Sequence, residues 1–142
     1  MSKHETWRTR QYWQTVGGLL IEEFVSVNAS ELNAKRPIDG LIVLNEPTAI
    51  HPNNFFDIKD KDVVIIQCKA TRLGMYLLGQ IYFSQFLIQK HLPRSIKLVA
   101  ICGKSDSIME ELAMAHNIEV VVIAESIMNY RYDDINEEII NK

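Results

Sequence analysis

The stretch "DVVIIQCKATRLG", Asp62–Gly74, decides the fold of this chain. Four consecutive β-branched aliphatic residues, 63–66, run directly into Gln67, Cys68 and Lys69. A continuous apolar run of this kind predicts a strand that is buried on both faces in the centre of a sheet. Side chains alternate across a strand, so Gln67 and Lys69 share one face and make it polar at the carboxyl end. Ligand sites of open α/β sheets lie at such strand ends, which makes this pair a candidate site.

The segments around this strand predict one α/β domain that covers residues 1–142. Strands and helices alternate in the second half of the chain, so we expect parallel crossover connections and a layered sheet. Gly17 and Gly18 weaken the middle of the first expected helix and indicate a close backbone approach there. The expected elements are a helix over about 7–25, a strand over 36–44, a long polar excursion over 45–62, a helix over 74–92 stopped by Pro93, a strand over 96–103, a helix over 105–117 capped by Ser105, a strand over 118–124 and a terminal helix over 132–142.

Composition excludes several classes of protein. The net charge of −3 means that any binding to nucleic acid must come from a local basic surface and not from overall attraction. Cys68 and Cys102 lie in apolar runs and form no CxxC pair, so we expect reduced core thiols. The amino-terminal "MSKHETWRTRQYW" has no apolar signal region, and the longest apolar run, "MYLLGQIYF", is too short to span a bilayer. We therefore expect a cytoplasmic protein without a membrane partner.

A second polar group interrupts the apolar strand "RPIDGLIVL". Asp39 follows a proline and an isoleucine and precedes Gly40. An unpaired buried carboxylate is costly, so Asp39 needs a cation, either Lys69 or a metal ion. The alternative is that Asp39 only forms a turn before Gly40. A similar alternative exists for Gln67 and Lys69: taken alone, they are explained as polar residues that enter solvent where the strand ends.

A third acid is expected from the first helix. At 100° per residue, Glu22 falls nearly opposite the apolar stripe of that helix, whereas Glu23 falls at its edge. Glu23 is therefore the better candidate to look along the sheet, and Glu22 the better candidate for a solvated residue. One acid from a helix, Asp39 from a strand and the Gln67–Lys69 pair from the next strand would then converge.

These motifs resemble the PD-(D/E)xK nuclease superfamily. The resemblance rests on "PID" at 37–39 and "QCK" at 67–69, and it spans roughly residues 7–124. Glutamine in place of the usual acid resembles the motif of the Mrr-type restriction endonucleases. The segment 98–123 resembles the closing strand–helix–strand of the same family. The resemblance implies a restriction-endonuclease-like αβββαβ core, a central mixed sheet flanked by helices. It also implies a metal-dependent endonuclease that hydrolyses phosphodiester bonds in DNA.

The resemblance assigns roles to the candidate residues, with Mg²⁺ (or Mn²⁺) as the cofactor. Asp39 would anchor the metal, and the side chain of Gln67 and the backbone carbonyl of Cys68 would add neutral oxygens. Glu23 would hold a water or a second ion. Lys69 would act as a point charge beside the attacking water or the scissile phosphate. Because Gln67 replaces an acid, metal affinity should be lower than in an acid-x-Lys site.

Nucleic-acid contacts are expected beside the catalytic pair. Lys69, Arg72 and Gln80 lie where they would reach a phosphate backbone. Tyr76 lies between them, and we favour a packing role for it. The type of nucleic acid, double-stranded, branched, RNA or methylated, stays open at this point.

The helix that contains residues 75–88 is apolar nearly all round. A helix covered on one face would not need this, so we expect a homodimer in which the sheet and a partner subunit both cover it. Two other interpretations stay open: a DNA-binding or assembly protein that keeps the nuclease fold with weak or no activity, and a plain α/β interaction module. If Glu23, Asp39, Gln67 and Lys69 do not converge, the enzyme hypothesis fails.

Overall fold

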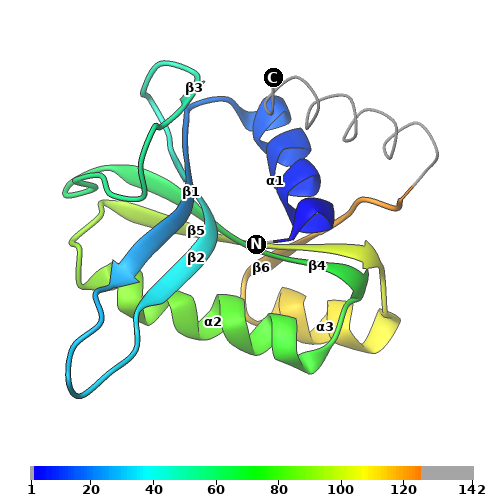
Figure 1. Ribbon diagram of the computed structural model, residues 1–142. Helices are drawn as coiled ribbons and strands as arrows, with labels where there is room; N and C mark the ends of the chain where they lie inside the picture. The colour runs from blue at the N-terminus through cyan, green and yellow to red at the C-terminus, as the bar shows by residue number, and fades with distance from the viewer. Residues whose placement is uncertain (1, 126–142) are drawn as a thin grey trace.

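The computed structural model describes residues 2–125 and is a mixed α/β fold with three helices and a six-stranded sheet (Figure 1). The elements are α1 (Lys3–Val16), β1 (Leu19–Val27), β2 (Arg36–Val43), β3 (Ala49–Ile50), β4 (Asp62–Arg72), α2 (Met75–Gln89), β5 (Ser95–Lys104), α3 (Ser107–Ala115) and β6 (Ile118–Val122). No helix within 2–125 has the length and apolarity needed to cross a membrane.

The sheet has the strand order β3-β1-β2-β4-β5-β6. The β1–β2 and β2–β4 pairs are antiparallel, and the β4–β5 and β5–β6 pairs are parallel. The predicted central position of β4 and the predicted parallel crossovers in the second half are therefore confirmed. The order also places β2 and β4, which carry the candidate residues, side by side.

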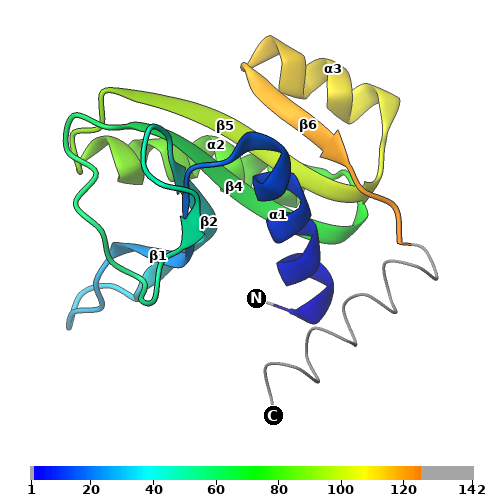
Figure 2. The same cartoon turned by 90° about the horizontal axis from the view of Figure 1, so that it is seen from above.

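Two apolar layers hold the sheet between its helices. Figures 1 and 2 show α1 on one face and α2 with α3 on the other. Alternation along β4 separates the two layers, because Val63 and Ile65 join the cluster that contains Leu77 of α2, while Val64 joins the cluster that contains Trp7 of α1. The predicted burial of both faces of this strand is confirmed.

Arg8 of α1 is fully buried and ties the first helix to the end of the last strand. Its Nε donates to the carbonyl of Ile123 at 2.7 Å, and one Nη donates to the carbonyl of His4 at 2.7 Å. The guanidinium also lies 4.5 Å from the centre of the Trp7 ring. A buried cation is tolerated only with such partners, so Arg8 fixes how α1 lies on the sheet.

The prediction of one helix over 7–25 is wrong. The helix ends at Val16, and β1 follows after Gly17 and Gly18, whose φ angles are 82° and 85°. Both angles lie in the left-handed region that glycine adopts readily, and a Cβ on Gly18 would lie 2.7 Å from the carbonyl oxygen of Val43. The glycine pair therefore does mark a close backbone approach, at the end of a helix and not inside one.

Asp106, not Ser105, caps α3, because its Oδ1 accepts hydrogen bonds from the N–H groups of Ile108 and Met109. The expected terminal helix over 132–142 lies outside the described residues. The polar excursion over 45–62 is present and carries the short edge strand β3.

Candidate functional site

The strands β2 and β4 separate at the candidate site. Their pairing runs from Val43↔Val63 to Gly40↔Ile66 and stops there, although both strands continue. Asp39 and Gln67 are the first residues beyond the last pair, so they stand at the opening of a fork in the sheet. A fork exposes backbone groups that a neighbouring strand would otherwise pair, and these groups need other partners.

Asp39 provides one of these partners. Its Oδ2 accepts a hydrogen bond from the backbone N–H of Cys68 at 2.9 Å. Burial raises the pKa of the Asp39 carboxyl from 3.8 to about 6. The Cys68 hydrogen bond and the positive charge of Lys69 oppose this rise, while the negative charge of Glu5 adds to it. Asp39 is thus a carboxylate whose surroundings favour either a proton or a bound cation.

Gln67 bridges three elements through its amide. Its Oε1 accepts from the backbone N–H of Asp39 at 3.4 Å, and its Nε2 donates to Oγ of Ser84 in α2 at 3.1 Å. The Ser84 hydroxyl in turn donates to the carbonyl of Gln80. With only 5% of its surface exposed, Gln67 is not a strand end that meets water. The alternative that Gln67 is explained by exposure to water at the strand end is therefore wrong.

Lys69 extends the same side of β4 toward solvent. Its Nζ lies 5.3 Å from the centre of the Tyr76 ring, within the range of a cation–π contact. Tyr76 is 71% exposed, so it does not pack into the core of this chain as expected. Arg72 is also exposed, and Gln80 is half-buried on α2. A cation and an exposed aromatic ring thus stand together at the mouth of the fork.

The acid expected from the first helix is a different residue. Glu23 lies on β1, not on a helix, and the helix acid whose charge acts on Asp39 is Glu5 in the first turn of α1. The stretch "SKHE" contains the signal that could have found it. Ser2 caps the helix and accepts from the N–H of Glu5 at 3.3 Å, which is the spacing of a capping box and places the helix start at Lys3.

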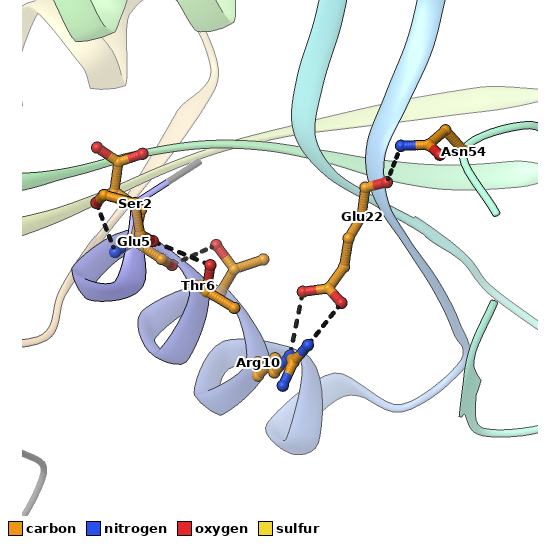
Figure 3. Close-up of polar contacts among 7 residues, drawn as sticks. Ser2, Glu5, Thr6, Arg10, Glu22 and Asn54 are labelled. Carbon is orange, nitrogen blue, oxygen red and sulfur yellow. Dashed lines mark hydrogen bonds and ion pairs between the residues drawn. The ribbon is translucent and has the colours of Figure 1, made fainter. Parts of the chain in front are cut away.

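Glu22 and Glu23 nevertheless lie close to the fork. The register pairs Glu22 with Gly40 and Phe24 with Ile38, so Glu23 falls opposite Asp39 on the neighbouring strand. Glu23 has a φ of 50°, a left-handed conformation that costs free energy in a residue other than glycine. Glu22 is not simply solvated as expected, because Arg10 donates to both of its carboxylate oxygens, at 3.1 and 2.9 Å (Figure 3).

A polar cleft of about 320 Å³ adjoins these two residues. The side chain of Asn54 fixes its wall by donating to the backbone carbonyls of Glu22 and Glu23, at 3.4 and 3.2 Å. Two lining residues relate the cleft to the fork, because Thr6 follows Glu5 in α1 and Glu23 lies opposite Asp39 in the register of β1 and β2. Its lining residues are Thr6, Arg10, Glu22, Glu23, His51, Pro52, Asn53 and Asn54.

The oxygen donors at the fork fit a magnesium ion with few protein ligands. In the part of the chain that the structure describes, no three His, Cys, Asp or Glu side chains gather closely enough to hold a metal by themselves. Mg²⁺, however, is commonly bound through one or two carboxylates and keeps several waters. Asp39 supplies a carboxylate with a neighbouring acid in Glu5, and the N–H and carbonyl of Cys68 leave the strand toward the same edge, so this carbonyl also faces the fork.

The structure therefore brings together Asp39, Gln67, Lys69 and the Cys68 backbone, with Glu23 on the adjoining strand and Glu5 in place of the expected helix acid. Comparison of the chain with models of protein families, with curated proteins and with solved structures finds no match.

Proposed function

We propose that this chain is a metal-dependent endonuclease that hydrolyses phosphodiester bonds in DNA, built on a restriction-endonuclease-like core. The element order supports the proposal: α1, β1, β2, β4, α2 and β5 follow the αβββαβ order of that core, with β3 as a short addition at the edge. The parallel β4–β5 pair beside two antiparallel pairs agrees with a mixed central sheet.

The observation that carries the proposal is the fork beyond Gly40 and Ile66. It collects a half-buried carboxylate with a raised pKa, a buried amide and a cation within one strand opening. Titratable groups that burial perturbs and that face a specific charged neighbour are typical of functional sites. Hydrogen bonding to the free backbone groups of the fork explains a polar side chain at each position, but it does not require a carboxylate with a raised pKa near Lys69.

Each residue at the fork has a role in this proposal. Asp39 and the Cys68 carbonyl would hold Mg²⁺. The amide oxygen of Gln67 would orient Asp39 by accepting from the Asp39 backbone N–H. Glu5 would hold a water or a second ion. A bound Mg²⁺ would polarise a phosphoryl oxygen and ease deprotonation of water. Lys69 would stabilise the negative charge that develops on the phosphate oxygens as water attacks phosphorus and the ester P–O bond breaks. Arg72 and Gln80 would contact the flanking phosphates.

The proposal is tested by incubating the protein with a panel of linear, branched and methylated duplex DNA, single-stranded DNA and RNA. Each substrate is tested with Mg²⁺, with Mn²⁺ and with a chelator. We expect cleavage of DNA that requires the metal and that is lost in Asp39→Asn. Cleavage that survives the chelator, or that Asp39→Asn retains, would overturn the proposed site.

A second candidate function is a DNA-binding or assembly protein that keeps this scaffold without efficient catalysis. The observation that favours it is the Gln67 amide, whose oxygen and nitrogen both already have partners within the protein, Asp39 and Ser84. For this candidate, gel-shift assays would detect metal-independent binding to DNA that Arg72→Ala weakens, while no substrate of the panel is cleaved.

A further inference from the structure

The outer face of α2 is apolar and largely exposed, and Lys69 of β4 lies against its first turn, with Nζ 5.3 Å from the centre of the Tyr76 ring. Buried residues of this helix face the sheet, and the opposite face carries residues spaced at three and four positions. These outer residues are Met75 (65% exposed), Tyr76 (71%), Gly79, Phe83 (66%) and Phe86 (45%). The whole segment Met75–Gln89 contains no charged residue, so a partner for its outer face is expected to be uncharged as well.

Gly79 lies at the centre of this face and has no explanation within one molecule. A Cβ built at this position meets nothing within 4 Å, and the backbone φ is not in the left-handed region. Glycine in a helix interior costs about 1 kcal/mol relative to alanine, so alanine would be the better residue for an isolated chain. A small residue at the centre of an exposed apolar helix face indicates that another backbone approaches closely there.

The missing side chain at position 79 opens an apolar groove between α2 and α3. The groove has a volume of about 210 Å³ and is lined by Met75, Leu78, Gly79, Tyr82, Leu112 and His116, with Ile118 at its end. Tyr82 stands between groove and ridge, because its ring makes edge contacts with Phe86 and His116, at centroid distances of 5.5 and 5.4 Å. A ridge, Phe83 and Phe86, thus stands one turn from a hollow on the same helix.

We propose that this face binds a second copy of the same chain, with two α2 helices crossing at Gly79 about a two-fold axis. A two-fold interface must be self-complementary, and this face carries both the aromatic ridge and the groove that can receive it. Nucleic acid fits the centre of this face poorly, because α2 itself carries no cation and Lys69 lies beside Tyr76 in the first turn only.

The exposed aromatic surface is large enough to matter. If a whole aromatic side chain buries about 200 Å², then Tyr76, Phe83 and Phe86 expose roughly 350 Å² in each copy. A stable interface of ordinary size buries about 800 Å² per partner, so these three side chains supply nearly half of it. Met75 and the groove walls contribute a further part of the same continuous face.

The proposal is tested without nucleic acid or metal, so its outcome is independent of the proposed nuclease activity. In sedimentation equilibrium at micromolar concentration, the wild-type chain should have twice the 16.4 kDa mass of one copy. Phe83→Glu places a charge in the interface and should weaken dimerisation at least about 100-fold, the scale of a hot-spot residue. Leu32→Glu, at a 96% exposed loop position, is the matched control and should not change the mass.

A crosslinking experiment then locates the crossing point. Both native cysteines are buried, so an introduced thiol is the accessible one. Gly79→Cys should form a disulfide-linked dimer under mild oxidation, whereas Gln89→Cys, near the helix end, should not, because a disulfide requires Cα atoms within about 7 Å. A monomeric wild type, an unchanged mass for Phe83→Glu, or equal crosslinking at positions 79 and 89 would overturn the proposal.

Discussion

The two halves of β4 differ in the strands that pair with them and therefore in their roles. Over Val63 to Ile66 the strand is paired with β2 on one edge and β5 on the other, and it is apolar on both faces. From Gln67 onward the β5 edge stays paired, while β2 has turned away. Side chains of Asp39 and Gln67 then take over the role of the missing backbone partners.

The contribution to stability and the candidate catalytic groups are therefore separated along one strand. The paired half contributes burial, at about 25 cal/mol for each Å² of apolar surface removed from water. The open half gives up ladder hydrogen bonds and gains polar groups, the buried Gln67 and the half-buried Asp39 and Lys69. Substitutions in the open half should therefore change metal binding and catalysis more than folding.

The largest effect is expected from Asp39→Asn. The variant keeps an oxygen that can accept from the Cys68 N–H, so the fork should remain folded. It loses the carboxylate, so metal binding and cleavage should both fall below detection. Mn²⁺ titration by calorimetry and cleavage assays check this. A variant that binds Mn²⁺ as well as wild type would remove Asp39 from the site and end the contrast between the two halves.

A smaller effect is expected from Lys69→Ala. The metal ligands stay in place, so Mn²⁺ binding should survive. Cleavage should fall by at least about 100-fold, the scale for losing one charge-stabilising group. Lys59→Ala, at an exposed position of the polar excursion, serves as the control and should cleave normally. Cleavage by Lys69→Ala at the wild-type rate would show that this cation is only a solvated residue beside Tyr76.

The raised pKa of Asp39 predicts how stability depends on pH in the metal-free protein. Its folded-state pKa of about 6 lies above the unfolded value near 3.8, because burial disfavours the charge. The protonated Asp39 carboxyl therefore makes its full contribution to the free energy of unfolding below pH 4. This contribution, at most about 3 kcal/mol, is lost as the pH rises through 6.

Urea unfolding in chelator, compared for wild type and Asp39→Asn at pH 4 and pH 7, measures this loss. As the pH rises, the free energy of unfolding of wild type should fall relative to that of Asp39→Asn. Added Mn²⁺ should reverse the shift for wild type only. An equal pH dependence of the two proteins would mean that Asp39 is solvated at the fork.

The smallest effect is expected from Gln67→Glu. The new carboxylate lies beside Asp39 and exchanges an amide donor for an acceptor facing Ser84, so the metal-free protein should lose roughly 1–3 kcal/mol of unfolding free energy. With Mn²⁺ the added charge is compensated, so metal should bind more tightly and cleavage should persist or rise. Ser84→Ala is the matched control, since it removes the hydrogen bond without adding charge. Weaker Mn²⁺ binding in Gln67→Glu would exclude this side chain from the metal site.

The sequence predicted β4 and the second half of the fold because those signals are local. Four β-branched residues and an uncharged helix leave few alternatives, and Pro93 marks the end of α2 within a few residues. The first helix was predicted too long because Leu20 and Phe24, buried residues of β1, happen to continue a helical spacing from Trp13. Gly17 and Gly18 were the competing signal, and their left-handed geometry decides the outcome.

At the candidate site, Asp39, Gln67 and Lys69 could be predicted because strand alternation and neighbouring strand ends bring them together. Glu5 could not be found by the same reasoning, because its place beside Asp39 depends on how α1 lies across the sheet. Long-range packing of that kind leaves no periodic trace in the sequence. The capping-box spacing of Ser2 and Glu5 would have indicated a helix that begins early enough to carry Glu5.

The buried guanidinium of Arg8 has a consequence for the order of events during synthesis. Its acceptor, the Ile123 carbonyl, lies 115 positions later in the chain. The ribosome releases α1 before the strands. The Arg8 side chain, which fixes α1 on the sheet, can bond to the Ile123 carbonyl only after β6 has emerged. Because an unpaired buried charge is costly, we expect the first helix to remain undocked on nascent chains and to join the sheet in one of the last steps of folding.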